Sequence, residues 1–249
     1  IGDNTSKVTK YDNPNRTLTD PYEGQQLGEI WGYVVDGYFK TDEEARNYKV
    51  DQSFVNQMIN ASALDNGLHA GDLKFVDLDG NNKIEQTTSA NDRKDMKVIG
   101  NSLPRYNYNF GISADWYGID FSVLFQGIGK QNWYPGAETS MFWGPYSRPY
   151  ASFIPSDFMS QVWSEENTNA YFPRPRGYVA LGSNRELAVV NTKYLQNLAY
   201  CRLKNLSIGY TLPDKWLSKI GFEKIRVYFS GENLLTFTKL HSDYIDPEQ

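Results

Sequence analysis

Hydrophobic and polar residues alternate without a break along residues 106–116. The apolar or aromatic positions and the polar or small residues between them are Tyr106, Tyr108, Phe110, Ile112, Ala114 and Trp116, and Asn107, Asn109, Gly111, Ser113 and Asp115. Residues 119–126 repeat this alternation, interrupted only by Leu124. Because successive side chains of a β-strand point to opposite faces, the pattern predicts two strands. Tyr117-Gly118 between them predicts a two-residue hairpin turn.

A second pair of strands is predicted near the end of the sequence. Leu206, Ile208 and Tyr210 alternate with small or polar residues, and the same pattern returns along residues 225–237. Arg202 and Lys204 break the apolar phase of the first of these strands. We therefore expect either a β-bulge or the end of the strand at these two residues.

The connections between the strands differ in length. Tyr117-Gly118 and residues 213–224 are short, whereas about 70 residues separate Gly127 from Gln196 and about 100 precede Tyr106. Short turns on one side and long loops on the other are typical of an outer-membrane barrel, and about eleven tilted residues suffice to cross a bilayer. An antiparallel sandwich with polar outer faces gives the same alternation, so the pattern alone leaves both architectures open.

Residues 1–105 are rich in turn-forming residues and show little periodicity. Thr41 followed by Glu44 has the spacing of a capping box, which predicts a short helix that extends to about Tyr48. Residues 29–39 predict a β-hairpin, or an extended aromatic segment, that turns at Asp36-Gly37. We expect the rest of this region to be irregular.

Composition narrows the classes of function. The 249 residues are 15% aromatic and 22% charged, with a formal net charge of -5, which fits neither a disordered chain nor a basic nucleic-acid binder. Cys201 is the only cysteine, and His69 and His241 are the only histidines. The sequence shows no nucleophile with a matching base, so we expect no enzyme. It also has no run of about 18 apolar residues that would predict a transmembrane helix.

Several segments, in the same order along the chain, resemble SusC/RagA-type TonB-dependent outer-membrane transporters. They are Gly24 to Phe39, Gly71 to Ile84 (GDLKFVDLDGNNKI), Ile99 to Pro104, Arg202 to Pro213 (RLKNLSIGYTLP), Trp216 to Lys239 and Asp246 to Glu248. The resemblance implies an all-β fold, with this chain forming the C-terminal portion of a 22-stranded, plugged transmembrane barrel. We then expect residues 1–105 to be a long extracellular loop region and residues 106–249 to hold barrel strands with a large external loop at 128–195.

The resemblance also implies a function and partners. Such a transporter lies in the bacterial outer membrane, with its loops facing the cell exterior. It is energised through TonB, acts with a SusD-like surface lipoprotein, and imports oligosaccharides or peptides. Contacts with membrane lipid are implied, and nucleic acid is not. The alternative that we weigh is a soluble β-sandwich that binds carbohydrate through its aromatic residues.

An acidic segment resembles the start of a calcium loop. Oxygen ligands at positions 1, 3, 5 and 7 of an EF-hand-like loop would come from Asp77, Asp79, Asn81 and the Lys83 carbonyl group. Asn82 stands where glycine is usual, and Thr88 stands where a bidentate carboxylate is expected. We expect Asp92 to supply the missing acid and Ca²⁺ to stiffen an outer loop. An Asx-rich turn held by its own hydrogen bonds is the alternative.

The segment from Ile128 to Tyr178 is dense in aromatic residues. They are Trp133, Tyr134, Phe142, Trp143, Tyr146, Tyr150, Phe153, Phe158, Trp163, Tyr171, Phe172 and Tyr178. Aromatic faces stack on sugar rings and also anchor protein interfaces. Trp133, Trp143 and Tyr146 are therefore our candidates for substrate contacts, while the alternative is that most of these rings pack the loop together.

Overall fold

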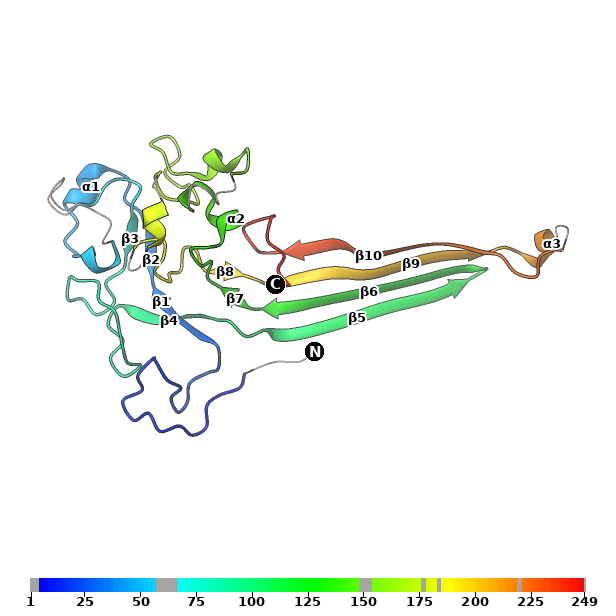
Figure 1. Cartoon of the computed structure of the whole chain (residues 1–249), viewed down its shortest axis with the longest axis horizontal. Helices are drawn as coiled ribbons and strands as arrows, with labels where there is room; N and C mark the ends of the chain where they lie inside the picture. Colours follow the sequence, from blue (N-terminus) through cyan, green and yellow to red (C-terminus); the bar gives the residue numbers. More distant parts are fainter. Residues whose placement is uncertain are drawn as a thin grey trace.

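The computed structural model describes residues 5–56, 67–147, 154–175, 178–182, 185–218 and 221–248. A long sheet projects from a broad body in Figure 1. We call this sheet the barrel sheet; its strands are β5 (Arg105–Trp116), β6 (Ile119–Lys130), β9 (Tyr200–Thr211) and β10 (Arg226–Thr238). We call the described parts of residues 5–103 and 131–199 the head, and residues 239–248 the tail.

The barrel sheet is antiparallel throughout, in the order β10-β9-β6-β5. Phe110 lies opposite Phe125, and Ile112 lies opposite Val123, so the alternating apolar residues of neighbouring strands share one face. Tyr117 and Gly118 both have positive φ, at 47° and 85°, which is the conformation of a tight hairpin turn. The two predicted strand pairs and the hairpin turn are confirmed.

A bulge interrupts β9 where Arg202 and Lys204 break the pattern. Leu203 pairs with Phe125 and Asn205 pairs with Leu124, so Lys204 is the extra residue. A bulge of this kind lets the alternation restart in a new phase. Leu203 and Leu206 consequently share the apolar face although they are three positions apart, an odd spacing that would put them on opposite faces of a regular strand. The predicted bulge is therefore confirmed.

The head contains short strands that pair far along the chain. They are β1 (Glu29–Tyr33), β2 (Val35–Tyr38), β3 (Leu73–Phe75), β4 (Met96–Asn101), β7 (Asn132–Trp133) and β8 (Gln196–Asn197). β1 pairs with β4, β2 with β3, and β7 with β8. The predicted hairpin at Asp36-Gly37 is wrong, because β1 and β2 find partners elsewhere; the extended alternative describes residues 29–38.

Helices are few and short in the described parts of the chain. They are α1 (Asp42–Arg46), η1 (Ser53–Val55), α2 (Ser140–Trp143), η2 (Gly144–Tyr146), η3 (Phe158–Gln161), η4 (Tyr178–Leu181) and α3 (Asp214–Leu217). Thr41 caps α1, since its Oγ1 accepts from the Glu44 N–H at 3.1 Å. The Glu44 carboxylate in turn accepts from the Lys40 N–H at 2.8 Å. The capping box is confirmed, although α1 ends two residues before Tyr48.

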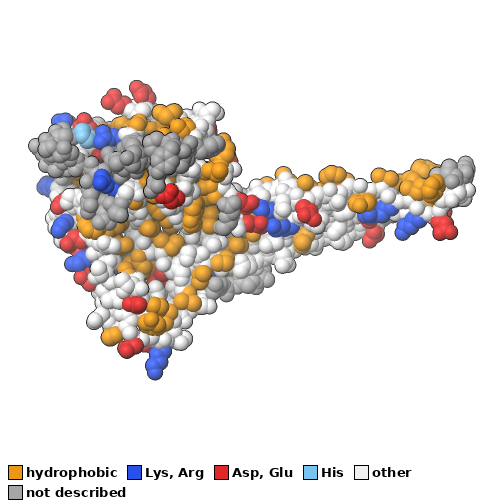
Figure 2. All heavy atoms as spheres, viewed as in Figure 1, with side chains coloured by type: hydrophobic (Ala, Val, Ile, Leu, Met, Phe, Trp, Pro, Cys, Tyr) orange, Lys and Arg blue, Asp and Glu red, His pale blue; other side chains and the backbone are white. Residues whose placement is uncertain are grey.

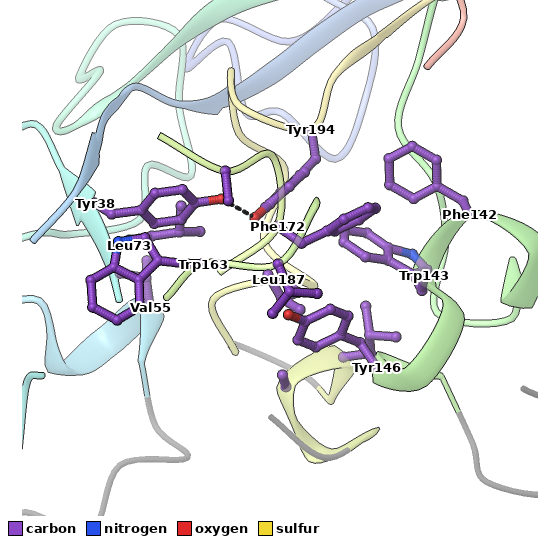
Figure 3. Packing of buried hydrophobic residues seen from close by; sticks show 14 of the residues in the cluster. Tyr38, Val55, Leu73, Phe142, Trp143, Tyr146, Trp163, Phe172, Leu187 and Tyr194 are labelled. Atoms are coloured by element: carbon purple, nitrogen blue, oxygen red, sulfur yellow. Dashed lines mark hydrogen bonds between the residues drawn. The ribbon is translucent and has the colours of Figure 1, made fainter. Parts of the chain in front are cut away.

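The main hydrophobic core lies in the head (Figure 3). Leu73, Phe75 and Ile84 from the first part of the chain pack in one cluster with Trp143 and Tyr194 from the loop between β6 and β9. Aromatic rings meet mostly edge to face, as in the pair Trp143 and Tyr194, whose centroids are 5.2 Å apart. The region before β5 and the loop between β6 and β9 therefore form a single packed body.

The all-β prediction is confirmed by this architecture, and the barrel sheet has the meander order of a barrel segment. Its hairpin turn and α3 lie at the end far from the head, whereas the long connections lie at the head (Figure 1). The division at residue 105, and the role of each part as external loop or barrel, stays a prediction.

Candidate functional site

The acidic loop brings three carboxylates together. Ligand atoms of Asp77, Asp79 and Asp95 all lie within 4.8 Å of one another. Asp77 accepts from the N–H groups of Gly80 and Asn82, both at 2.7 Å. The loop turns where Asn82 has a positive φ of 60°, a left-handed conformation that Asn tolerates better than most residues. The local turn therefore brings Asp77 and Asp79 together, and Asp95 joins them from further along the chain.

Asp95, which sequence reasoning missed, takes the place that we expected of Asp92. Asp95 is fully buried, and it accepts from the N–H groups of Leu78 at 2.8 Å and Glu85 at 2.7 Å, tying both ends of the loop. Asp92 is exposed and lies 3.5 Å from Lys94 Nζ. Spacing alone could not choose between these two acids, because the loop that follows Glu85 folds back through Thr87.

The other predicted ligands lie beside the acidic group. Asn81 directs its amide nitrogen at Asp79 and Glu85, at 3.2 and 3.0 Å, while its oxygen accepts from the Lys83 N–H at 2.8 Å. Lys83 Nζ lies 3.7 Å from a Glu85 oxygen. The loop thus holds its shape by its own hydrogen bonds, as the alternative reading has it, and still offers a donor set of carboxylates that suits Ca²⁺.

The pKa values of Asp95 and Asp77 shift in opposite directions. Burial raises the pKa of Asp95, and the neighbouring charges of Asp79 and Asp77 act in the same direction. Burial also acts to raise the pKa of Asp77, but hydrogen bonds from the N–H groups of Asn82, Gly80 and Asn81 outweigh it and lower the pKa. A cation at this point would offset the repulsion among the acids. Calcium binding stays a prediction.

The three candidate aromatic residues differ in accessibility. Trp143 and Tyr146 are 0% and 1% exposed, and both lie in the main core. The Trp143 indole N–H donates to the carbonyl of Gly136 at 3.0 Å, and the Tyr146 hydroxyl donates to that of Pro173 at 2.6 Å. These two side chains have no face open to a ligand, so their selection as substrate contacts is corrected: they are core residues.

Trp133 is half-buried and lines a cavity. The cavity has a volume of about 590 Å³, and its walls come from β7, the start of α2, the residues before β9 and the tail. The lining residues are Trp133, Glu138, Thr139, Ser140, Met141, Leu198, Tyr244, Ile245 and Asp246. An aromatic ring beside hydroxyl and carboxylate groups can stack on a flat ligand and hydrogen-bond to its polar edge.

The barrel sheet has two faces of opposite chemistry. Phe110, Ile112 and Trp116 are 49%, 60% and 71% exposed on one face, and Val227, Phe229 and Phe237 are exposed on the same face of β10. Large apolar side chains exposed together on one face of a sheet are unusual for a protein in water and ordinary for a protein in contact with lipid. Figure 2 shows hydrophobic side chains gathered at the end of the sheet far from the head.

The opposite face carries polar side chains that pair with one another across strands. The hydroxyl groups of Ser113 and Ser122 lie 3.0 Å apart. Arg226 on β10 donates from Nε to Asp120 on β6 at 2.8 Å, reaching across β9. A Cβ at Gly209 of β9 would lie 2.5 Å from both side chains, so the glycine makes room for this ion pair.

A second ion-pair group on this face binds the tail; we call it the Arg202 clasp. Arg202 places Nη2 at 2.6 Å from an Asp246 oxygen and Nη1 at 2.8 Å from a Glu248 oxygen, and its Nε donates to Thr236 at 2.8 Å. Lys204 Nζ lies 2.9 Å from the same Glu248 oxygen. The bulge at Lys204 is what puts both cations on the polar face. The Arg202 side chain is only 8% exposed.

These features define the class of protein: an antiparallel sheet with one apolar and one polar face, capped by a head at one end, is a segment of a membrane-spanning β-barrel. None of the helices in the described ranges is long and apolar enough to cross a membrane. No family model matches the chain.

Comparison with known proteins identifies the type of barrel. TonB-dependent receptor P3 of Formosa agariphila is 31% identical over 228 residues, which cover 91% of this chain and 19% of that protein. TonB-dependent receptor P39 of the same organism is 27% identical, covering 87% of this chain and 22% of that protein. The chain thus spans about a fifth of the length of these relatives.

Solved structures show the same fold. A structure of the RagAB peptide importer in the open-open state has a TM-score of 0.53 at 21% identity, covering 96% of this chain and 21% of that chain. A structure of the RagAB peptide transporter gives 0.52 at 17% identity, covering 98% and 22%. The resemblance drawn from the sequence motifs is confirmed: the chain is a segment of a SusC/RagA-type TonB-dependent transporter.

Proposed function

We propose that this chain is part of a TonB-dependent importer of the bacterial outer membrane. The observation that carries the proposal is the barrel sheet, whose exposed apolar face fits lipid and whose opposite face pairs polar groups. The relatives are named receptors and importers, which agrees with a transport role and offers no support for an enzyme. The soluble β-sandwich alternative leaves the exposed face of Phe110 and Ile112 without a partner.

The proposal includes an orientation. The long loop between β6 and β9 lies in the head, whereas the hairpin turn and the short connection that contains α3 lie at the other end of the barrel sheet. Bacterial outer-membrane barrels have long extracellular loops and short periplasmic turns. The head then faces the cell exterior, where it would meet cargo and a SusD-like surface lipoprotein, and TonB would act from the other side through parts of the transporter beyond this segment.

Cargo is proposed to be an oligosaccharide or a peptide. Trp133 is the one of our three candidate aromatic residues that has an open face, and its cavity lies at the junction of the head with the barrel sheet. Ring stacking on Trp133 would serve a sugar, and the same ring with the polar groups of Glu138 and Thr139 would serve a peptide.

The test of the membrane assignment uses the full-length transporter that contains this segment, reconstituted in proteoliposomes. A nitroxide label is attached to one introduced cysteine at a time, in Phe110→Cys, Ile112→Cys and Phe121→Cys. Ser113→Cys and Ser122→Cys, on the other face, are the matched controls. We expect the first three labels to be relaxed by oxygen dissolved in lipid, and the controls by a water-soluble nickel complex. Labels at Ile112 and Ser113 that report the same aqueous environment would exclude the barrel assignment.

The partner is tested separately. The full-length transporter is purified from its own outer membrane with an affinity tag, in mild detergent. We expect a surface lipoprotein of the SusD-like type to co-purify in a fixed ratio. A transporter that purifies alone, and that still takes up cargo in cells lacking that lipoprotein, would remove the partner from the proposal.

A further inference from the structure

The Arg202 clasp joins a strand of the barrel sheet to a wall of the cavity. Asp246 takes part in both, since it accepts from Arg202 and also lines the cavity that Trp133 lines. Tyr244 and Ile245, which precede Asp246, line the same cavity. The end of the chain lies at the junction between the barrel sheet and the head in Figure 1, and Figure 2 shows acidic and basic side chains together at this junction.

The geometry of the clasp fixes the tail in more than one direction. Two separate guanidinium nitrogens of Arg202 reach two different carboxylates, and Nε is held by Thr236 on the neighbouring strand. Asp246 additionally accepts from the Glu248 N–H at 2.9 Å, which closes the turn around Pro247. The planar guanidinium group of Arg202 is thus held at three nitrogens, which leaves it little freedom to reorient.

Removal of Arg202 would cost more than the loss of surface ion pairs usually does. Its side chain is almost fully buried, and Glu248 is three-quarters buried. Charge-assisted hydrogen bonds to a buried guanidinium are stronger than exposed ones, and without Arg202 the three-quarters buried Glu248 would lose one of its two cationic partners, while Asp246, which is 44% exposed, would lose its ion pair. We then expect the tail to separate more often from the polar face of the barrel sheet.

We propose that Arg202 is a positioning residue, which holds residues 244–246 in place as part of the wall of the Trp133 cavity and thereby sets how tightly that cavity binds cargo. The first half stands on the clasp alone. The second half rests on the proposed function, in which the cavity contacts cargo.

The first measurement is hydrogen exchange of the full-length transporter in detergent micelles, followed by mass spectrometry of peptides that cover residues 240–248. We expect Arg202→Gln to speed exchange there by about tenfold or more, because the segment opens locally. Arg202→Lys restores part of the protection, since one ammonium group can reach one carboxylate. Arg226→Gln is the matched control, because it breaks an ion pair on the same face at the other end of the barrel sheet.

The second measurement is calorimetric binding of two probes, penta-alanine and maltoheptaose. For a probe that the wild type binds, we expect Arg202→Gln to weaken the affinity by about tenfold, Arg202→Lys to weaken it less, and Arg226→Gln to leave it unchanged. Should Arg202→Gln fail to assemble, Glu248→Gln carries the same test, because it removes one carboxylate and keeps the arginine.

The outcomes distinguish the positioning role of Arg202 from its link to cargo binding. Unchanged exchange at residues 240–248 in Arg202→Gln overturns the positioning role, whatever the probes do. Faster exchange with unchanged binding of a probe that the wild type binds overturns the link from the clasp to cargo. A wild type that binds neither probe counts against the cavity as a cargo site in the proposed function, and the exchange result then decides the clasp by itself.

Discussion

The head and the barrel sheet use similar side chains in opposite ways. Trp143 is fully buried in the aromatic-rich core of the head, whereas Trp116 at the end of β5 is 71% exposed. In the head, apolar side chains leave water by packing against one another. In the barrel sheet, they point away from the protein and need lipid to remove them from water. The aromatic content of a segment therefore does not show whether its rings lie in a protein core or face lipid; the strand pattern is needed to distinguish the two.

The largest effect that would sharpen this contrast is expected from Trp143→Ala. Loss of this buried ring should destabilise the head by about 3–5 kcal/mol, through lost contacts and the cavity left behind. Urea unfolding of the head in the full-length protein, followed by tryptophan fluorescence, measures it. Trp216→Ala, at an exposed position beyond β9, is the control and should change the midpoint little. Equal shifts for the two variants would contradict the assignment of Trp143 to a core.

A charge on the apolar face should have the next largest effect. Ile112→Arg is expected to cost about 2–4 kcal/mol near the middle of a bilayer, because the guanidinium would face hydrocarbon. Ser113→Arg, one residue further along β5, faces the polar side and should be tolerated. The fraction of transporter that migrates as folded barrel on a gel without heating measures both. A loss for Ser113→Arg as great as for Ile112→Arg would show that the two faces do not differ.

Calcium should stabilise the head and leave the barrel sheet unaffected. A cation present at about 100 times its Kd adds about 2.7 kcal/mol to the free energy of unfolding of the state that binds it. The measurement is the urea midpoint of the head with calcium and with a chelator. Asp95→Asn should abolish the difference and Asp92→Asn should preserve it, because only Asp95 joins the acidic group. If Asp92→Asn abolished the difference and Asp95→Asn preserved it, Asp92 would be the ligand, as its spacing in the sequence predicts.

The smallest effect is expected at the junction, from pH. Hydrogen bonds from Arg202 and from the Glu248 N–H lower the pKa of Asp246; for Glu248, burial acts to raise the pKa, but hydrogen bonds from Lys204 and Tyr200 outweigh it and lower the pKa. A carboxyl group with a lowered pKa stabilises the fold above its ordinary pKa and loses this contribution as the pH falls through the lowered value. Since both groups are partly exposed, we expect below about 1 kcal/mol from each.

Hydrogen exchange of residues 240–248, corrected for intrinsic rates, measures this loss between pH 7 and pH 3. Protection should fall in acid in the wild type and be nearly independent of pH in Arg202→Gln. A wild type whose protection rises in acid would reverse the sign and contradict the account of the clasp.

The barrel sheet could be predicted from the sequence because its pattern is local. Alternation from Tyr106 to Trp116, the Tyr117-Gly118 turn and the phase break at Lys204 are each visible within a dozen residues, and each is confirmed. The head could not be predicted in this way. β1 pairs with a strand more than sixty residues further along the chain, and no local signal in Glu29–Phe39 distinguishes that partner from a hairpin.

The candidate site was predictable only in part for the same reason. The acids at positions 1 and 3 of the loop, Asp77 and Asp79, lie within the acidic group, because their spacing is set by the loop itself. Asp95 enters the group through the path of the chain after Glu85, which spacing does not encode. Whether Trp133 or Trp143 has an open face depends on packing between distant segments. The sequence could therefore identify both as candidates for ligand contact but could not predict which of them is accessible.

The shared core of the head has a consequence for how such proteins change over generations. Leu73 and Phe75, which precede β5, are buried in one cluster with Trp143 and Tyr194, which follow β6. A recombination event with its breakpoint inside the barrel sheet would separate these partners and leave both halves with mismatched interiors. A laboratory chimera that exchanges residues 29–101 and 132–194 together should therefore keep this core intact, whereas one that exchanges only one of the two ranges should not.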